Sequence, residues 1–200
     1  MKILVADCCI RGRQSRTARL MDSAVEAVRA IDGNSVDYVD LKNMELKPFN
    51  ASMLEQRDAL LARGEMNNPM FEQAARFADA DMIIIAAPYW DMSFPSQLKI
   101  YIEHITVSGI TFGADNNGLK GLCRASSMLY LTTRGGYIAE GAKDEGAEYL
   151  RALCGMYGIG RFEYIGADGM DIPDGNGASL RLESARRQTC DIARELAGQR

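Results

Sequence analysis

Apolar residues in this chain are grouped into short runs and stripes whose spacing predicts strands that alternate with helices. The clearest run, Met82 to Ala87 (MIIIAA), is apolar at every position. A strand that is buried on both faces of a parallel sheet has this pattern, whereas a half-exposed strand alternates. Proline cannot donate to the ladder, so the strand ends at Pro88. A helix beginning at Pro95 follows, because apolar residues recur at i, i+3, i+4 and i+7: Leu98, Tyr101, Ile102 and Ile105.

The same criteria divide the rest of the chain into further strands and helices. Strands are predicted over Lys2–Ala6, Ser35–Leu41, Ser127–Thr133 and Arg161–Ala167. Helices are predicted from the capping residue Ser15 to about Asp32, over Met53–Ala62, Pro69–Ala80 and Lys143–Tyr157, and over a last segment that ends near Leu196. The polar, glycine-containing stretches Gly109–Gly121 and Asp168–Gly177 are predicted to be loops.

Strands that alternate with helices imply a parallel sheet with right-handed crossovers. We therefore predict an α/β fold in which a five-stranded parallel sheet, in the flavodoxin-like order 2-1-3-4-5, carries helices on both faces as a three-layer sandwich. The chain has 200 residues and shows no repeat or linker, which indicates a single domain over residues 1–200. The stretch from Lys42 to Asn68 is longer than a connection requires, which is typical of a lid or an interface segment.

Composition narrows the range of functions. A net charge of −4 with 25% charged residues gives no basic footprint for nucleic acid or anionic lipid. The chain opens directly with a strand pattern rather than a signal peptide, and no apolar run approaches membrane-spanning length. The five cysteines lack framework spacing, which indicates reduced thiols and a cytoplasmic location. The single histidine, His104, argues against a histidine-based metal site, and we expect no metal.

Three loops form the candidate functional site because of their place in the predicted topology. The carboxyl ends of the first, third and fourth strands lie side by side in that order, and ligands of open α/β sheets bind in the crevice beyond such ends. The loops at these ends are Cys8–Thr17, Pro88–Phe94 and Thr133–Tyr137.

The first loop, CCIRGRQSRT, suits an anion such as phosphate. It leads into a helix N-terminus, whose backbone N–H groups and positive dipole end attract anions. Arg11, Arg13 and Arg16 add charge, while Ser15 and Thr17 add hydroxyl donors. The alternative is a solvated loop with an ordinary serine cap, and neither a P-loop nor a GxGxxG pattern is present.

The other two loops suit a flat ligand. Four large apolar side chains in PYWDMSFP are able to wall a heterocycle, although they would equally cover the sheet edge or pack on a partner. Gly135 and Gly136 follow a strand directly and let the backbone approach a ligand closely, although a plain turn has the same pattern.

Motifs in these loops resemble the flavodoxin-like NAD(P)H:quinone oxidoreductase and FMN-dependent NADH-azoreductase family. The most specific stretch is APYWDMSFPSQLKIYIEHITVSGITF. It is similar to the family's A-P-x-[YW]-N-F-x-x-P-x-x-L-K-x-[YF]-[IF]-[DE] followed by G-[IV]-T-F. TTRGG is similar to [ST]-R-G-G, and SRTARL resembles the S-x-[ST]-x-x-L of the phosphate loop. The resemblance runs from Lys2 to about Tyr137 and continues more loosely beyond.

The resemblance implies an FMN site built from all three loops. Ser15, Arg16 and Thr17 would hold the phosphate together with Arg11, and Cys9 stands where relatives often have serine. The isoalloxazine would be lined by Pro88, Tyr89, Trp90, Asp91 and Met92, and its pyrimidine edge by Thr133, Arg134, Gly135 and Gly136.

The resemblance also implies an activity and an assembly. The activity is ping-pong hydride transfer from NAD(P)H to flavin N5 and on to a quinone or similar flat acceptor, azo compounds included. FMN carries this chemistry, so no catalytic side chain is required, although Arg134 is a candidate to offset charge on the reduced flavin. The family's enzymes are homodimers with sites at the interface, which implies a homodimer here. The substrate pocket would be formed by Trp90, Phe112, Tyr137 and Met53.

Two departures from the family pattern affect the expected chemistry. Asp91 stands where the motif has asparagine, and an ionised carboxylate only accepts hydrogen bonds. Its charge would lower the flavin potential unless the side chain points away. The phosphate loop has exchanged hydroxyls for cysteines and arginines, which favours charge-assisted hydrogen bonds, roughly twice as strong as neutral ones.

Three alternatives fit the sequence less well. One is a flavodoxin-type electron carrier that binds FMN but is not reduced directly by a nicotinamide. Another is a low-molecular-weight tyrosine phosphatase, which requires C-x5-R, and neither Cys8 nor Cys9 has that spacing to Arg16. The last is a flavin-free interaction domain of the same shape.

Overall fold

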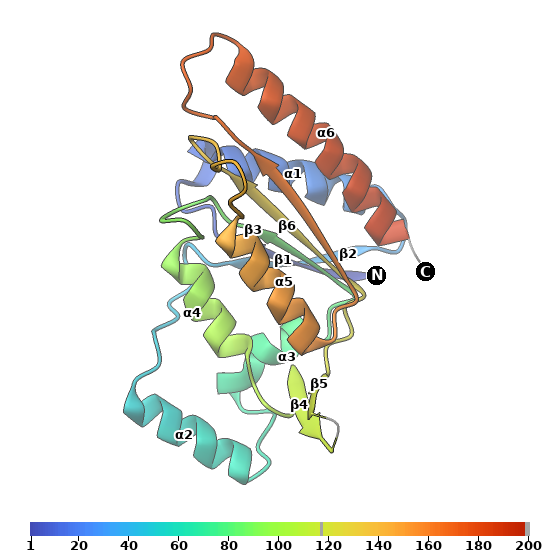
Figure 1. Ribbon diagram of the computed structural model, residues 1–200. Coiled ribbons are helices and arrows are strands. Elements are labelled where there is room, and N and C mark those ends of the chain that lie inside the picture. The colour runs from blue at the N-terminus through green and yellow to red at the C-terminus, as the bar shows by residue number, and fades with distance from the viewer. Residues whose placement is uncertain (117, 199–200) are drawn as a thin grey trace.

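A parallel five-stranded sheet forms the centre of the computed structural model, which describes residues 1–116 and 118–198 (Figure 1). The strand order is β2-β1-β3-β6-β7. Each neighbouring pair is parallel, as the alternation of strands and helices predicts. The strands are β1 Lys2–Asp7, β2 Ser35–Asp40, β3 Met82–Ala86, β6 Ser127–Thr133 and β7 Arg161–Ala167.

The predicted strand order 2-1-3-4-5 requires a correction, because Gly109–Gly121 is not a plain loop. It contains an antiparallel hairpin of β4 Phe112–Asp115 and β5 Gly118–Gly121, so the last two strands of the main sheet are β6 and β7. These short, largely exposed strands lack the apolar alternation that identifies a strand in sequence. A Cβ on Gly121 would lie 2.0 Å from the backbone nitrogen of Gly158, so the hairpin packs directly against the end of α5.

Helices cover both faces of the sheet, which confirms the three-layer arrangement. Side chains alternate along the buried strands, so Ile83 and Ile85 face one core cluster while Met82 and Ile84 face the other. Figure 1 shows α1 and α6 on one face and α3, α4 and α5 on the other. The helices are α1 Arg16–Arg29, α3 Glu72–Ala78, α4 Ser96–Ile105, α5 Glu145–Tyr157 and α6 Gly177–Gly198.

The segment between β2 and β3 contains the expected short helix, α2 Ala51–Ala62, which Asn50 caps. Figure 1 shows α2 projecting away from α1 and α6. The helix predicted over Pro69–Ala80 is divided into a 3₁₀ turn, η2 Pro69–Phe71, and α3. The division follows from Phe71, whose φ of −101° and ψ of 5° depart from helical geometry.

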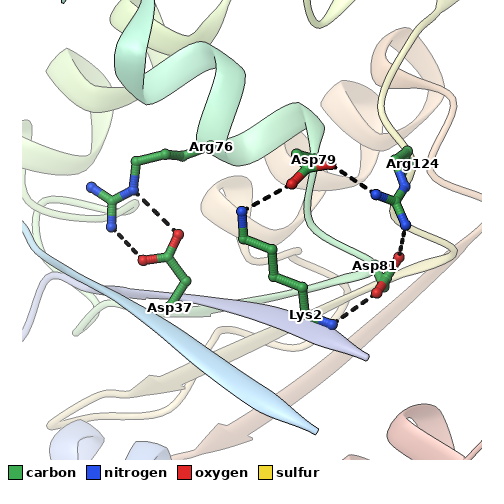
Figure 2. A network of polar contacts seen from close by, with 6 residues as sticks. All are labelled: Lys2, Asp37, Arg76, Asp79, Asp81 and Arg124. Atoms are coloured by element: carbon green, nitrogen blue, oxygen red, sulfur yellow. Dashed lines mark hydrogen bonds and ion pairs between the residues drawn. The ribbon is translucent and has the colours of Figure 1, made fainter. Parts of the chain in front are cut away.

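A charged network joins segments at the amino-terminal end of the sheet (Figure 2). The Lys2 ammonium pairs with Asp79 at 3.0 Å, and the Lys2 backbone N–H donates to Asp81 at 2.8 Å. Arg124 bridges the same two carboxylates, at 2.8 Å to Asp79 and 2.7 Å to Asp81. These contacts fix the starts of β1, β3 and β6 and leave the opposite, carboxyl-terminal edge for the candidate site. Within the described residues, no helix has both the length and the apolar character needed to cross a membrane.

Candidate functional site

The three predicted loops meet at the carboxyl-terminal edge of the sheet. Backbone hydrogen bonds continue beyond the strands, from Cys8 N to Ala86 O at 2.8 Å and from Tyr89 N to Thr133 O at 3.1 Å. A cavity of about 430 Å³ lies there, within the range typical of small-molecule sites. Its walls are formed by Arg11, Gln14, Ser15, Arg16, Pro88, Tyr89, Trp90, Thr133, Arg134, Gly135, Met170 and Asp171.

The first loop presents a helix N-terminus to this cavity. The chain turns through η1 Gly12–Gln14, and Ser15 then caps α1 by accepting a hydrogen bond from Ala18 N at 3.3 Å. The first N–H groups of a helix have no intrahelical acceptor, and the dipole there favours a negative ligand. With Arg11 and Arg16 also on the wall, this side of the cavity suits an oxyanion.

Two residues predicted for the phosphate site lie behind the cavity wall. Thr17 is fully buried, and its hydroxyl lies 2.8 Å from that of Thr133, which ties α1 to the end of β6. Cys9 is also buried, with its backbone N–H donating to Asp7 at 2.8 Å. Burial raises the pKa of both vicinal thiols, that of Cys8 to about 12. A nucleophilic cysteine requires the opposite shift, so this environment does not support phosphatase chemistry.

The second loop turns back on itself in two residues. Trp90 and Ser93 exchange backbone hydrogen bonds of 3.1 and 2.8 Å, with Asp91 and Met92 at the tip. Both tip residues are left-handed, with φ of 49° and 68°, a conformation that aspartate and asparagine tolerate better than most residues. The turn places Tyr89 and Trp90 on the cavity wall and directs Asp91 and Met92 to the exposed tip outside it.

The third loop approaches the cavity through its backbone and is held by the loop that follows β7. Arg134 N donates to Ala167 O at 3.0 Å, and Asp171 N donates to Gly135 O at 2.9 Å. A Cβ on Gly135 would lie 2.3 Å from the Asp171 carboxylate, so only glycine fits there without displacing that side chain. Gly136 and Tyr137 lie beyond the cavity wall.

The side chain of Arg134 is buried in a charged cluster beneath the cavity. It pairs with Asp144 at 2.8 Å and with Asp168 at 3.1 Å, and Tyr164 contacts the same guanidinium. Burial raises the pKa of Asp168, although the neighbouring Arg134 opposes the shift. Because one guanidinium faces two carboxylates, the charge of Arg134 is already balanced within the protein. The predicted electrostatic role of Arg134 stays a prediction.

Several residues that shape the site are absent from the sequence prediction. Gln14, Met170 and Asp171 line the cavity, and Arg181 holds the loop after β7 by donating to Asp168 O at 3.0 Å and Gly169 O at 2.5 Å. Asp168–Gly177 is predicted as an ordinary turn from its glycines and aspartates. Its position after a parallel strand is the signal that places it at the same edge of the sheet as the other loops.

The residues predicted for the substrate pocket are not all brought together in one chain. Trp90 lines the cavity and Tyr137 lies close to it, packed against Gly169. Phe112 lies on β4 and packs against the core cluster of the α3–α5 face, and Met53 lies on α2. Neither of these two lines the cavity.

Sequence comparisons identify relatives along most of the chain. A family profile described as "Flavodoxin-like fold" matches residues 1–191. The chain is 35% identical over 160 residues to an "FMN-dependent NADH:quinone oxidoreductase" of Clostridium perfringens, covering 80% of this chain and 81% of the relative. It is 33% identical over 190 residues to "FMN-dependent NADH:quinone oxidoreductase 2" of Clostridium acetobutylicum, covering 92% and 90%.

Comparison with solved structures supports the same fold. An FMN-dependent NADH-azoreductase from Bacillus anthracis, crystallised in complex with FMN, superimposes with a TM-score of 0.84 and 19% identity. The match covers 98% of this chain and 99% of that one. An NAD(P)H:quinone oxidoreductase from Methanothermobacter marburgensis gives a TM-score of 0.72 at 16% identity, covering 96% and 98%.

Proposed function

This chain belongs to the flavodoxin-like family that contains the FMN-dependent NADH:quinone oxidoreductases, and from that membership and the cavity we propose that it is an FMN-dependent NAD(P)H oxidoreductase. It takes electrons from a nicotinamide and passes them to a quinone or a similar flat conjugated acceptor. The observation that carries the proposal is the convergence of all three loops on one cavity. We take residues 1–200 to act as one domain.

The residues around the cavity fit FMN. At one end, Arg16 already binds an oxyanion, because the Asp171 carboxylate lies 2.6 Å from its guanidinium. Ser15 and the α1 N-terminus lie beside it, which is the donor set that a phosphate requires. Tyr89 and Trp90 supply aromatic walls elsewhere in the cavity, and Gly135, which lies against Asp171, leaves its backbone accessible.

We assign the FMN phosphate to Arg11, Ser15 and Arg16, and its ring to the walls made by Pro88–Trp90 and Thr133–Gly135. When bound, FMN supplies the hydride acceptor and the electron donor of the reaction. The protein orients the ring and excludes water from one of its faces. Thr17 acts from behind the wall by fixing α1 to β6, and the side chain of Arg134, buried beneath the cavity, supports Tyr89. Asp91, Met92 and Gly136 remain candidates for contacts at the rim.

Steady-state kinetics of the FMN-loaded protein test the activity. Initial rates measured against NADH, at several fixed concentrations of a soluble quinone, should give parallel double-reciprocal lines, because one substrate leaves before the other binds. An azo dye replaces the quinone in a second series, and NADPH replaces NADH in a third. A protein that retains FMN yet shows no turnover with either nicotinamide and any acceptor would contradict the proposal.

We further propose that the protein is a cytoplasmic homodimer. Trp90, Met92 and Tyr137 are 37%, 63% and 60% exposed, so large apolar side chains surround the cavity. A second copy would cover them, and Phe112 and Met53 would then reach the partner's cavity. The five cysteines are free, which suits a reducing compartment. Light scattering after size-exclusion chromatography should give twice the chain mass, and a monomer at micromolar concentration would contradict the dimer.

A further inference from the structure

We propose that Asp171 is an internal anion that competes with the phosphate of FMN for Arg16 and thereby sets how tightly the chain holds its cofactor. The inference rests on the proposed function, because it concerns the same cavity. It assigns a role to a residue outside the three loops that define the site in sequence.

The ion pair between Arg16 and Asp171 joins distant parts of the chain across the cavity. Arg16 is the first residue of α1, and Asp171 lies in the loop after β7. The guanidinium Nη1 and the carboxylate Oδ1 are 2.6 Å apart, and both residues line the cavity. Arg16, whose guanidinium suits a phosphate, is therefore already paired with a negative charge of the protein itself.

Hydrogen bonds hold the backbone around Asp171, which keeps this residue at the cavity. Met170 N donates to Arg134 O at 3.0 Å, and Asp171 N donates to Gly135 O at 2.9 Å, so two consecutive residues pair with the third loop. From the other side, Arg181 donates to the carbonyl of Asp168 at 3.0 Å and pairs with Asp174 at 2.5 Å. The carboxylate rests against Gly135 at a place that any side chain on residue 135 would occupy.

The pair is weak enough to be exchanged. The side chains of Arg16 and Asp171 are 42% and 70% exposed, and exposed ion pairs change an equilibrium constant by about fivefold or less. A phosphate carries more charge than a carboxylate, and the α1 N-terminus also attracts it, so phosphate outcompetes Asp171 for Arg16. The carboxylate then remains beside the bound phosphate as a like charge, which opposes binding.

This arrangement distinguishes flavins by their phosphate. FMN meets both the competition for Arg16 and the repulsion from Asp171, whereas riboflavin, which lacks the phosphate, meets neither. Removal of the charge at position 171 should therefore tighten the binding of FMN but not that of riboflavin. Since the effect is electrostatic between exposed groups, added salt should diminish it.

The test is fluorescence titration of the apoprotein with FMN and with riboflavin, at low and high salt, for the wild type and Asp171→Asn. Asparagine keeps the shape of the side chain and removes its charge. We expect the FMN dissociation constant to fall about two- to fivefold at low salt and by less at high salt, while riboflavin binding is unchanged. Asp191→Asn, the same charge change at an exposed position on α6 outside the cavity, should leave both constants unchanged.

Unchanged or weaker FMN binding by the Asp171→Asn protein overturns the inference, because the carboxylate would then be neutral to the cofactor or would contribute a contact. A gain that is equal at both salt concentrations also overturns it, because the substitution would then act through loop shape. Asp171→Ser, which removes the charge with a shorter side chain, should reproduce the gain. A wild-type protein that binds no FMN would refute the proposed function itself, whereas binding without the gain refutes only the role of Asp171.

Discussion

The guanidinium of Arg134 lies 4.7 Å from the centre of the Tyr89 ring, so a residue at the end of β6 supports the aromatic wall at the end of β3. Cation–π contacts of this kind contribute about 0.5–2 kcal/mol, more when they are shielded from water. The same guanidinium pairs with both Asp144 and Asp168, so the wall of the cavity and the charged cluster beneath it depend on one side chain.

Arg134→Gln should therefore destabilise the fold strongly. The substitution leaves the buried carboxylate of Asp144 without its cationic partner, and loss of one partner of a buried pair costs about 3–5 kcal/mol. Urea unfolding measures the change in the free energy of unfolding. Arg124→Gln is the matched control, since Arg124 also pairs with two aspartates but is 61% exposed. Comparable losses in the two variants would show that burial of the Arg134 cluster is energetically unimportant.

Arg16→Ala should weaken FMN binding by roughly 1.5–3 kcal/mol, about ten- to a hundredfold in the dissociation constant, because one charge-assisted phosphate contact is lost. Titration of the apoprotein with FMN measures the effect. Arg187→Ala, an exposed arginine on α6 outside the cavity, should bind FMN as the wild type does. An unchanged constant for Arg16→Ala would remove this residue from the phosphate site.

Asp91→Asn should change the flavin potential only slightly, although the family motif has asparagine at this position. The residue lies at the exposed tip of the second loop and does not line the cavity, so its charge is well screened. An exposed charge that does not line the cavity should contribute less than about 0.5 kcal/mol, which is about 10 mV for a two-electron couple. Potentiometric titration of the wild type and the variant measures the flavin potential. A shift of several tens of millivolts would show that the carboxylate faces the flavin.

The same position tests the turn geometry. Asp91 has a φ of 49°, which asparagine tolerates and a β-branched residue does not. Asp91→Val should therefore lower the free energy of unfolding by about 1–2 kcal/mol, while Asp91→Asn leaves it within about 0.5 kcal/mol. Equal stability of the two variants would indicate that the left-handed turn is not formed in solution.

The stability of the fold should decline in acid because one ion pair, between Arg76 and Asp37, is then lost. Figure 2 shows this pair beside the Lys2 network. Arg76 donates two hydrogen bonds to Asp37, at 3.2 and 2.6 Å, and these bonds lower the pKa of the Asp37 carboxyl. Because the folded-state pKa lies below the unfolded value of about 3.9, the pair stabilises the protein above that pH and is lost as the pH falls through the folded-state pKa.

Asp37→Asn removes this contribution. At neutral pH the variant should be less stable than the wild type by about 0.5–1 kcal/mol, and the difference should shrink as the pH falls below about 4. Urea unfolding at several pH values measures the stability difference at neutral pH and its decrease at low pH. A difference that persists unchanged at low pH would mean that the asparagine disturbs packing rather than the ion pair.

The buried elements of the fold were predictable because burial requires a recognisable pattern of apolar residues in the sequence. The run from Met82 to Ala87 is apolar at every position since both faces of β3 are covered, and the helix stripes point to the same two layers. The β4–β5 hairpin has no such apolar pattern. Its exposed, four-residue strands are stabilised by a close backbone contact between Gly121 and Gly158, which no local pattern encodes.

The candidate site, like the fold, was predictable only in part. Its three loops were predictable, because sheet topology determines which strand ends lie side by side. The directions of individual side chains were not, since they depend on partners far along the chain. Arg134 turns toward Asp144 and Asp168, Thr17 toward Thr133, and Arg16 toward Asp171, which is 155 residues away.

Anaerobic mixing of the purified protein with one equivalent of FMN, followed by NADH or NADPH, tests the central claim most directly. The cavity should hold one FMN per chain, seen as a shifted yellow absorbance that stays with the protein on gel filtration. That absorbance should then bleach promptly on addition of a nicotinamide and return when a quinone is added. A protein that takes up no FMN, or whose bound flavin stays oxidised with both nicotinamides as in a pure electron carrier, would contradict the account.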